Sequence, residues 1–385
     1  MHENKATPIR VAQILGKMNG GGAEQVVMNY YRAIDRSRVQ FDFFLFKSSK
    51  LVPAEEIKEK GGRLYLLCGF KSPVRYIRTL TTLLRENNYA IVHCHLSTLS
   101  FLPLLAAKRA GVPVRIIHNH STSGGGRELV RNIAKALFKP LARAFATHRF
   151  ACSEHAARWM YGAAYTAELS DKNTLEGARG KIVRIMRNAI DIGHFCFDGS
   201  KRSAFRSEFG VADETLLFGH VGRFCPQKNQ QFLIQVFKEI LRVHPNSKLI
   251  MAGVGEDMEL IRAKTASAGI SKKVIFAGHR SDVDRLYSAI DCFLLPSNYE
   301  GLGMAGVEAQ CAGLYCLFSD KVPREVKVGD GAQFLSLKTS CADWALAAVD
   351  CANLRNDKAA EQVVQAGYDI DAEAEKLCGF YISVK

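Results

Sequence analysis

Two glutamates, Glu300 and Glu308, flank a glycine-rich stretch that reads Glu-Gly-Leu-Gly-Met-Ala-Gly-Val-Glu. The apolar run 292–296 predicts a strand before it, so Glu300 is expected in a loop and Glu308 about one turn inside the next helix. Carboxylates accept hydrogen bonds from hydroxyl groups, and backbone N–H groups at a helix start bind phosphate. The stretch predicts a site for a ligand with hydroxyl groups and a phosphate. The alternative is two ordinary surface glutamates, and the many small residues between and after them favour the ligand site because they allow a ligand to approach closely.

A second loop carries two cations. Arg223 and Lys228 follow the apolar run 216–221, which predicts another strand. A loop that follows a strand can point both side chains into one cleft, where they would neutralise a diphosphate leaving group as its charge develops. The alternative is a pair of solvated surface cations.

Two further glycine loops each lie between a predicted strand and a predicted helix. Gly20, Gly21 and Gly22 follow the run 9–15, and Gly255-Glu256 follows the run 248–253. Glycine lets backbone approach a ligand closely and leaves N–H groups for an anion. Neither loop has the Gly-x-Gly-x-x-Gly or Walker spacing, so an ordinary turn stays open as the alternative for both.

Two histidine pairs, His93-x-His95 and His118-x-His120, each end a predicted strand. Histidines two apart on a strand share a face and could bind a metal. No carboxylate or third ligand accompanies either pair at a useful spacing, so we expect no metal and place one histidine of the second pair in the site. Asp282 is expected to cap a helix rather than to hold a metal.

The elements that must position these residues alternate between strand and helix along the whole chain. This rhythm predicts parallel sheets with helices on both faces, and ligands then bind beyond the carboxyl ends of the strands. Because 385 residues exceed one ordinary core, we expect two doubly wound domains that face each other across a cleft. The expected bounds are 1–195 and 196–370, with a turn-rich and polar boundary that includes 198–207, and a final helix 371–385 that packs back on the first domain.

Composition and local patterns indicate the cellular compartment of the protein. Charged residues make up 23% of the chain, no apolar run is long enough for a transmembrane helix, and the start lacks the layout of a signal peptide. Eleven cysteines without a Cys-x-x-Cys pair indicate a reduced compartment, so we expect a cytoplasmic protein without disulfides.

The net charge of +14 is placed unevenly. Residues 1–195 hold 30 Lys and Arg against 14 Asp and Glu, whereas the remainder holds 22 against 24. In the run 127–143, cations recur every four residues between apolar ones. This pattern predicts either an amphipathic helix on an anionic membrane or a packed helix with a solvated basic stripe. A nucleic-acid partner is not expected, since no recognition helix or aromatic-bearing sheet is evident.

Taken together, these pieces resemble the family 4 retaining glycosyltransferases of the GT-B type, in which two Rossmann-like domains face each other. The resemblance rests on the order and spacing of the motifs that begin at Gly20, His118, Asn188, Gly222, Gly253 and Glu300, and it covers nearly the whole chain. In detail the chain is similar to bacterial enzymes of exopolysaccharide and capsule synthesis. Alanine at 189, where the family usually has glycine, and Leu302, where phenylalanine is common, remove no charged group.

The resemblance implies transfer of a sugar from a nucleotide-sugar, expected to be a UDP-sugar, to a glycan or lipid-linked acceptor at the inner face of the membrane. Arg223 and Lys228 would hold the diphosphate, Glu308 the ribose and Glu300 the sugar, while His120, in preference to His118, would donate to the transferred sugar. Neither a metal nor another cofactor is implied. The alternative is a nucleotide-sugar epimerase or a glycan phosphorylase of the same architecture. The full expected donor site is Gly21, Gly22, Arg223, Lys228, Gly255, Glu256, Glu300, Gly301, Leu302, Gly303, Met304 and Glu308.

Overall fold

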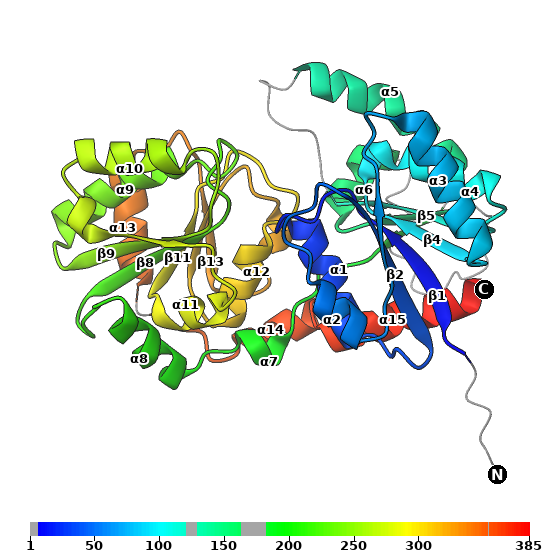
Figure 1. Ribbon diagram of the computed structural model, residues 1–385. Helices are drawn as coiled ribbons and strands as arrows, with labels where there is room; N and C mark the ends of the chain where they lie inside the picture. Colours follow the sequence, from blue (N-terminus) through cyan, green and yellow to red (C-terminus); the bar gives the residue numbers. More distant parts are fainter. Residues whose placement is uncertain (1–6, 121–128, 163–181, 353) are drawn as a thin grey trace, which may run out of the picture. The chain divides into compact units, whose positions relative to one another are not determined.

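The computed structural model of the protein describes residues 7–120, 129–162, 182–352 and 354–385. The chain divides into two compact units (Figure 1). The first comprises residues 1–189 and 370–385, and the second comprises residues 190–369. The division falls between Ala189 and Ile190, a few residues before the boundary expected after residue 195.

The first unit is built on a parallel sheet with the strand order β3-β2-β1-β4-β5-β6-β7. The central strands are largely buried on both faces because helices cover both sides of the sheet (Figure 1). Its strands are β1 (Ile9–Ile14), β2 (Val39–Phe46), β3 (Leu64–Leu67), β4 (Ile91–Cys94), β5 (Val114–Asn119), β6 (His148–Ala151) and β7 (Val183–Ile185). Its helices are α1 (Gly22–Ala33), α2 (Ala54–Glu59), α3 (Pro73–Glu86), α4 (Phe101–Arg109), α5 (Leu129–Phe145), α6 (Glu154–Tyr161) and α15 (Ile370–Val384).

Helix α15, at the end of the chain, belongs to the first unit. It lies beside α1 and β2, and it buries Leu377, Phe380 and Tyr381 in the same core as Phe41 of β2 and Tyr31 of α1. Tyr381 is fully buried, and its ring meets the edge of Phe41. The last helix therefore completes the core of the unit that contains the start of the chain.

The second unit repeats this architecture with the strand order β10-β9-β8-β11-β12-β13. Its strands are β8 (Leu216–Val221), β9 (Ser247–Ala252), β10 (Val274–Gly278), β11 (Cys292–Leu295), β12 (Cys316–Ser319) and β13 (Ala332–Leu335). Its helices are α7 (Ile192–Phe195), α8 (Gly199–Glu208), α9 (Gln230–Val243), α10 (Met258–Ser267), α11 (Val283–Ala289), α12 (Met304–Cys311), α13 (Cys341–Cys351) and α14 (Ala359–Gln365). Two parallel-sheet, Rossmann-like units are the fold class that the sequence predicts.

The polar stretch 198–207, expected as part of the domain boundary, is instead helix α8. The Asp198 side chain caps it by accepting hydrogen bonds from the backbone N–H groups of Ser200 and Lys201. The helix is held by two fully buried residues, Phe205 and Arg206, and the guanidinium of Arg206 lies 3.4 Å from the Asp291 carboxylate. A polar composition concealed the helix because one of its two inward residues is itself charged.

None of the described helices is both long and apolar enough to cross a membrane. Helix α5 covers most of the basic run 127–143. Arg127, and the side chains of Arg131 and Lys135, lie outside the described residues.

Candidate active site

In each unit the strand order reverses beside the first strand, and an open parallel sheet binds ligands at the carboxyl ends of the strands at this point. In the second unit the flanking strands are β8 and β11. The loop after β8 carries Arg223 and Lys228, and the loop after β11 carries Glu300. The topology therefore brings together the cations and the carboxylate that lie more than 70 residues apart in the sequence.

Lys228 and Glu300 form the centre of this arrangement. The Lys228 ammonium donates to Glu300 Oε1 at 2.7 Å, and only 16% and 6% of the two side chains are exposed. Glu300 also accepts from the Ser297 hydroxyl at 2.6 Å and from the Gln227 amide at 3.1 Å. Ser297 and Gln227 were not predicted, since no sequence pattern marks a residue that only orients another side chain. The carboxylate is thus held in one orientation by three donors.

Glu308 lies on α12 and accepts a hydrogen bond from the Tyr287 hydroxyl at 2.9 Å. Burial raises the pKa of the Glu308 carboxyl, and the Tyr287 hydrogen bond and the positive charge of Lys228 act in the opposite direction. The same lysine charge, after burial, helps to lower the pKa of His220 at the end of β8. The field of Lys228 therefore reaches several groups of this loop cluster.

Arg223 differs from Lys228 in that its side chain is 71% exposed. Its guanidinium donates to Glu256 at 2.9 Å, and the Glu256 side chain is 53% exposed. An exposed pair of this kind contributes little to stability. Arg223 is therefore free to exchange its partner for a ligand phosphate at small cost.

The glycines of the two loops allow the backbones to touch. A Cβ atom on Gly255 would lie 2.1 Å from the Phe224 carbonyl oxygen, and one on Gly253 would lie 2.1 Å from the Gly222 carbonyl oxygen. Gly222 in turn leaves room for the stem of Lys228, whose Cε would be 3.1 Å from an added Cβ. These glycines are required by packing of the protein on itself, in addition to any approach of a ligand.

The small residues of α12 have a similar explanation, which corrects the expectation that they only admit a ligand. A Cβ on Gly306 would come within 2.8 Å of the Phe318 ring on β12, and Ala309 is fully buried in the core. Leu302 is also buried in this core, so any donor contact at that position falls to the backbone. Gly303 caps the helix with φ of +92°, a conformation that favours glycine.

The glycine loop of the first unit is closed on itself. The Glu24 carboxylate accepts from the backbone N–H groups of Asn19 and Gly21, at 2.6 and 2.9 Å. Gly22 starts α1 and has open space beside it. An anion that uses the Gly21 N–H must therefore displace Glu24 from it, which the sequence pattern did not predict.

All four histidines gather where β4 and β5 end in the first unit. The β4–β5 register pairs His93 with Ile116, which puts His118 beside His95 in the next position along the strands. Ring centroids of His118 and His120 are 3.9 Å apart, and those of His93 and His95 are 4.3 Å apart. Burial lowers the pKa of each ring, to about 3 for His120, so all four are neutral at pH 7.

The expectation that no third ligand accompanies a histidine pair is wrong, because the neighbouring strand supplies it. Ligand atoms of His93, His95 and His118 lie within 4.8 Å of one another. The His93 ring is stacked nearly parallel to the His95 ring and to the His118 ring. The nitrogen lone pairs lie in the planes of these rings, so they do not converge on one point. The donor geometry therefore does not fit a shared metal ion.

Contrary to the prediction from the sequence, Asp282 does not cap α11 with its side chain, and it pairs with Arg280 and Arg285 instead.

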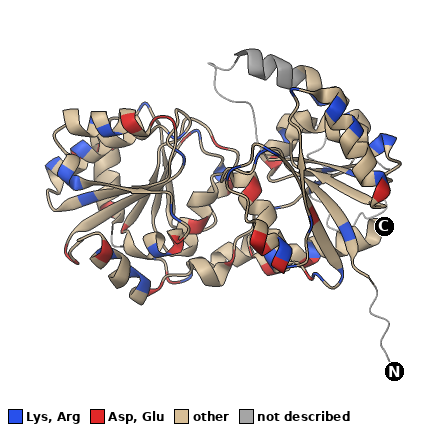
Figure 2. Cartoon of the chain, in the orientation of Figure 1, with Lys and Arg blue, Asp and Glu red and all other residues tan. Residues whose placement is uncertain are grey.

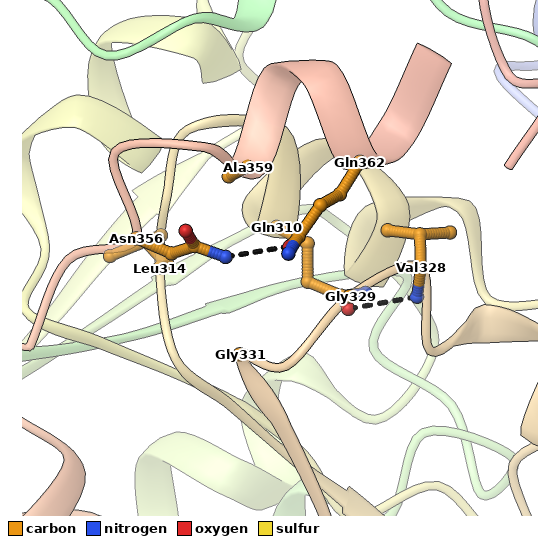
Figure 3. Close-up of a pocket in the computed structure, with 8 residues that line it drawn as sticks. All are labelled: Gln310, Leu314, Val328, Gly329, Gly331, Asn356, Ala359 and Gln362. Atoms are coloured by element: carbon orange, nitrogen blue, oxygen red, sulfur yellow. Dashed lines mark hydrogen bonds between the residues drawn. The ribbon is translucent and has the colours of Figure 1, made fainter. Parts of the chain in front are cut away.

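A small hollow in the second unit is lined by none of the predicted site residues (Figure 3). Its lining includes Gln310, Gly329, Asn356 and Gln362, and Asn356 donates to Gln362 across it at 2.7 Å. The cavity volume is about 10 Å³, which is about the room that a single water molecule needs. We therefore assign it no ligand.

Comparison with known families gives two matches. Residues 20–164 match the model described as Glycosyltransferase Family 4, and residues 201–368 match the model of Glycosyl transferases group 1.

Among curated relatives, the chain is 32% identical to the glycosyltransferase EpsF of Bacillus subtilis over 97% of its own length and 96% of the relative. It is 23% identical to the UDP-Gal:alpha-D-GlcNAc-diphosphoundecaprenol alpha-1,3-galactosyltransferase of Escherichia coli, with 94% of each chain covered. Among solved structures, Anabaena HepE in complex with UDP and glucose superposes with a TM-score of 0.79 over 97% of this chain and 100% of HepE, at 17% identity.

Proposed function

The chain belongs to the family 4 glycosyltransferases of the GT-B fold, and we propose that it moves a sugar from a UDP-sugar, with retention of configuration, to a saccharide hydroxyl in cell-surface polysaccharide synthesis. The acceptor is a glycan or a lipid-linked saccharide. The epimerase and phosphorylase alternatives are not favoured, because the relatives above are named as glycosyltransferases.

The observation that carries the proposed donor site is Lys228, a largely buried cation held beside Glu300 at the point where the strand order reverses. In the transfer, the bond between the anomeric carbon and the diphosphate oxygen breaks and the acceptor oxygen bonds to that carbon. The diphosphate leaves with the bonding electron pair, and one of its oxygens takes up the proton that the acceptor hydroxyl loses. Lys228, Arg223 and the N-terminus of α12 stabilise this charge, and the carboxylates of Glu300 and Glu308 accept from sugar and ribose hydroxyls.

UDP is proposed as the nucleotide because two similar proteins name it: the galactosyltransferase uses UDP-Gal, and HepE is complexed with UDP. We expect UDP to raise the unfolding temperature of the full chain by several degrees in a thermal-shift assay, since a ligand at 100 times its Kd adds about 2.7 kcal/mol. GDP and ADP should give smaller shifts. Because lysine and arginine supply the positive charge, the UDP shift is expected to survive EDTA. A larger shift with GDP or ADP, or loss of the UDP shift in EDTA, contradicts the proposal.

We also propose that the first unit rests on an anionic membrane surface, where a lipid-linked acceptor lies. The excess of Lys and Arg belongs to this part of the chain, and Figure 2 shows such positions on several of its helices. On α5, Leu137 and Leu141 are 68% and 44% exposed and lie one turn apart. Exposed leucines on a helix of a basic domain are suited to insertion at a lipid interface.

We expect the protein to sediment with vesicles that contain phosphatidylglycerol and not with phosphatidylcholine alone, and added salt should weaken the binding. Leu137→Gln with Leu141→Gln should reduce the bound fraction several-fold because two apolar anchors are lost. Val74→Gln, which alters an 80% exposed valine on α3, is the matched control. Equal binding to both vesicle types, or equal loss in the control, contradicts the membrane proposal.

A further inference from the structure

His93, His95, His118 and His120 of the first unit are joined by hydrogen bonds into two branches that start at one residue, Gln13 of β1. Its side-chain oxygen lies 2.8 Å from His95 Nε2, and its side-chain nitrogen donates to the Tyr381 hydroxyl at 3.2 Å. Gln13 and Tyr381 are buried, and they are separated by 368 positions in the sequence. Helix α15 thus brings the end of the chain into contact with the histidine cluster.

The first branch runs from Gln13 through His95 to His120. An amide oxygen only accepts, so His95 carries its proton on Nε2 and donates it to Gln13. A neutral imidazole has one N–H, so His95 Nδ1 is bare and accepts from His120 Nε2 at 2.8 Å. The single proton of His120 is thereby placed on Nε2. Its Nδ1 is a bare acceptor that has no hydrogen-bond partner among the described residues.

The second branch runs from Gln13 through Tyr381 and His93 to His118. The Tyr381 hydroxyl lies 2.6 Å from His93 Nδ1, and His93 Nε2 lies 3.1 Å from His118 Nδ1. If Tyr381 donates, His93 donates to His118, and the only unpaired group at the end of the branch is the Nε2–H of His118. If His93 donated to Tyr381 instead, the buried tyrosine proton would also lack a partner, at a cost of about 1–3 kcal/mol. The first direction is therefore favoured.

The surroundings keep these assignments in place. The ring of Phe150 lies against His93 and His118, and Phe380 packs on the Phe150 ring, so apolar groups cover this side of the cluster. Burial raises the pKa of Tyr381, so this residue keeps the proton that it donates. Burial also lowers the pKa of all four histidines, so each ring holds one proton.

We propose that Gln13 and Tyr381 are positioning residues that fix the tautomers of His118 and His120, so that this stacked pair offers one N–H donor and one bare acceptor to hydroxyl groups of the bound saccharide. A hydroxyl group both donates and accepts, so these two buried nitrogens without a partner among the described residues are complementary to it. This inference rests on the proposed glycosyl transfer. It adds that Tyr381, on the last helix of the chain, determines which open nitrogen of His118 and His120 donates and which accepts.

The test is Tyr381→Phe in the full chain, which removes the hydroxyl and keeps the ring. Two-bond proton–nitrogen NMR of histidine-labelled protein reports which ring nitrogen carries the proton, with signals assigned by single substitutions. In the variant, His93 and His118 are expected to lose their single tautomer. We expect kcat to fall about tenfold or more, since reacting groups lose their alignment, with little change in the UDP thermal shift. Tyr31→Phe is the matched control, because Tyr31 is buried in the same unit and its hydroxyl donates only to the Ile57 carbonyl at 3.0 Å.

Altered tautomers together with a lowered kcat in Tyr381→Phe, and neither change in Tyr31→Phe, support the inference. Unchanged tautomers overturn it, and so do altered tautomers with unchanged kcat. Failure of the proposed function is recognised separately, because the wild-type protein would then show neither transfer nor a UDP shift while the tautomer measurement still decides the hydrogen-bond arrangement.

Discussion

Replacing Lys228 by methionine is expected to lower kcat/KM for sugar transfer by about two to three orders of magnitude. The ammonium is the more buried of the two proposed diphosphate ligands, with 16% of the side chain exposed against 71% for Arg223. A charged donor in a water-poor site stabilises developing negative charge by about 3–4 kcal/mol. Methionine keeps an unbranched stem of similar length, so it removes the charge and little packing.

The substitution also leaves Glu300 without its cation, and this effect must be separated from catalysis. Glu300 is 6% exposed, and removing one member of a buried ion pair destabilises a protein by several kcal/mol. The double variant Lys228→Met, Glu300→Gln carries no unpaired charge, so we expect its unfolding temperature to return most of the way to the wild-type value. Its turnover should stay as low as that of the single variant.

Lys273→Ala is the control for the loss of one positive charge from the second unit, because Lys273 donates to the Pro245 carbonyl at an exposed position and has no carboxylate partner among the described residues. It should retain wild-type turnover. If Lys228→Met keeps its activity, or if the double variant recovers turnover together with stability, Lys228 does not act on the diphosphate.

The sequence was sufficient to predict the elements that bury a continuous apolar run. The predicted strand 216–221 coincides with β8, and the predicted strand 292–296 is one residue longer than β11. Strands β6 and β13 were missed, since each mixes polar with apolar residues. Helix α8 was missed for a related reason, because a buried arginine and an aspartate cap give no apolar period.

The candidate site could be predicted only as residue types, without their pairings. That Lys228 pairs with Glu300 depends on β8 and β11 being neighbours, and strand order is not written in local patterns. The contact between Gln13 and Tyr381 is more remote still, since it requires α15 to return to the first unit. Local periodicity indicates that the chain ends in a helix. The unit against which this helix packs depends on which hydrophobic core it completes, and local periodicity does not report that.

The first unit is expected to unfold in mild acid before the second. Burial lowers the pKa of His93, His95, His118 and His120 in the first unit, whereas the second unit holds one such histidine, His220, with a pKa of about 4. An unfolded histidine titrates near pH 6.5, so below this pH the unfolded chain binds protons that the native core excludes. Stability therefore falls as pH drops from about 6.5 toward 4.

The size of the effect follows from the number of excluded protons. Each such histidine contributes a slope of roughly 1.4 kcal/mol per pH unit, so four contribute up to roughly 5 kcal/mol per pH unit. This is comparable to the whole stability of a domain, about 5–15 kcal/mol. In the second unit Glu308 works against His220, because its raised pKa means that the native state takes up a proton as pH falls.

Each unit has its own fluorescent reporter, since the two tryptophans of the chain are Trp159 on α6 and Trp344 on α13. Trp344→Phe leaves a signal from the first unit only, and Trp159→Phe leaves one from the second. Urea unfolding at pH 7 and at pH 5.5 should show a large fall in midpoint for the Trp159 signal and a small one for the Trp344 signal. Equal falls would mean that the histidines become protonated within the native core, and such protonation would also break the two branches that begin at Gln13.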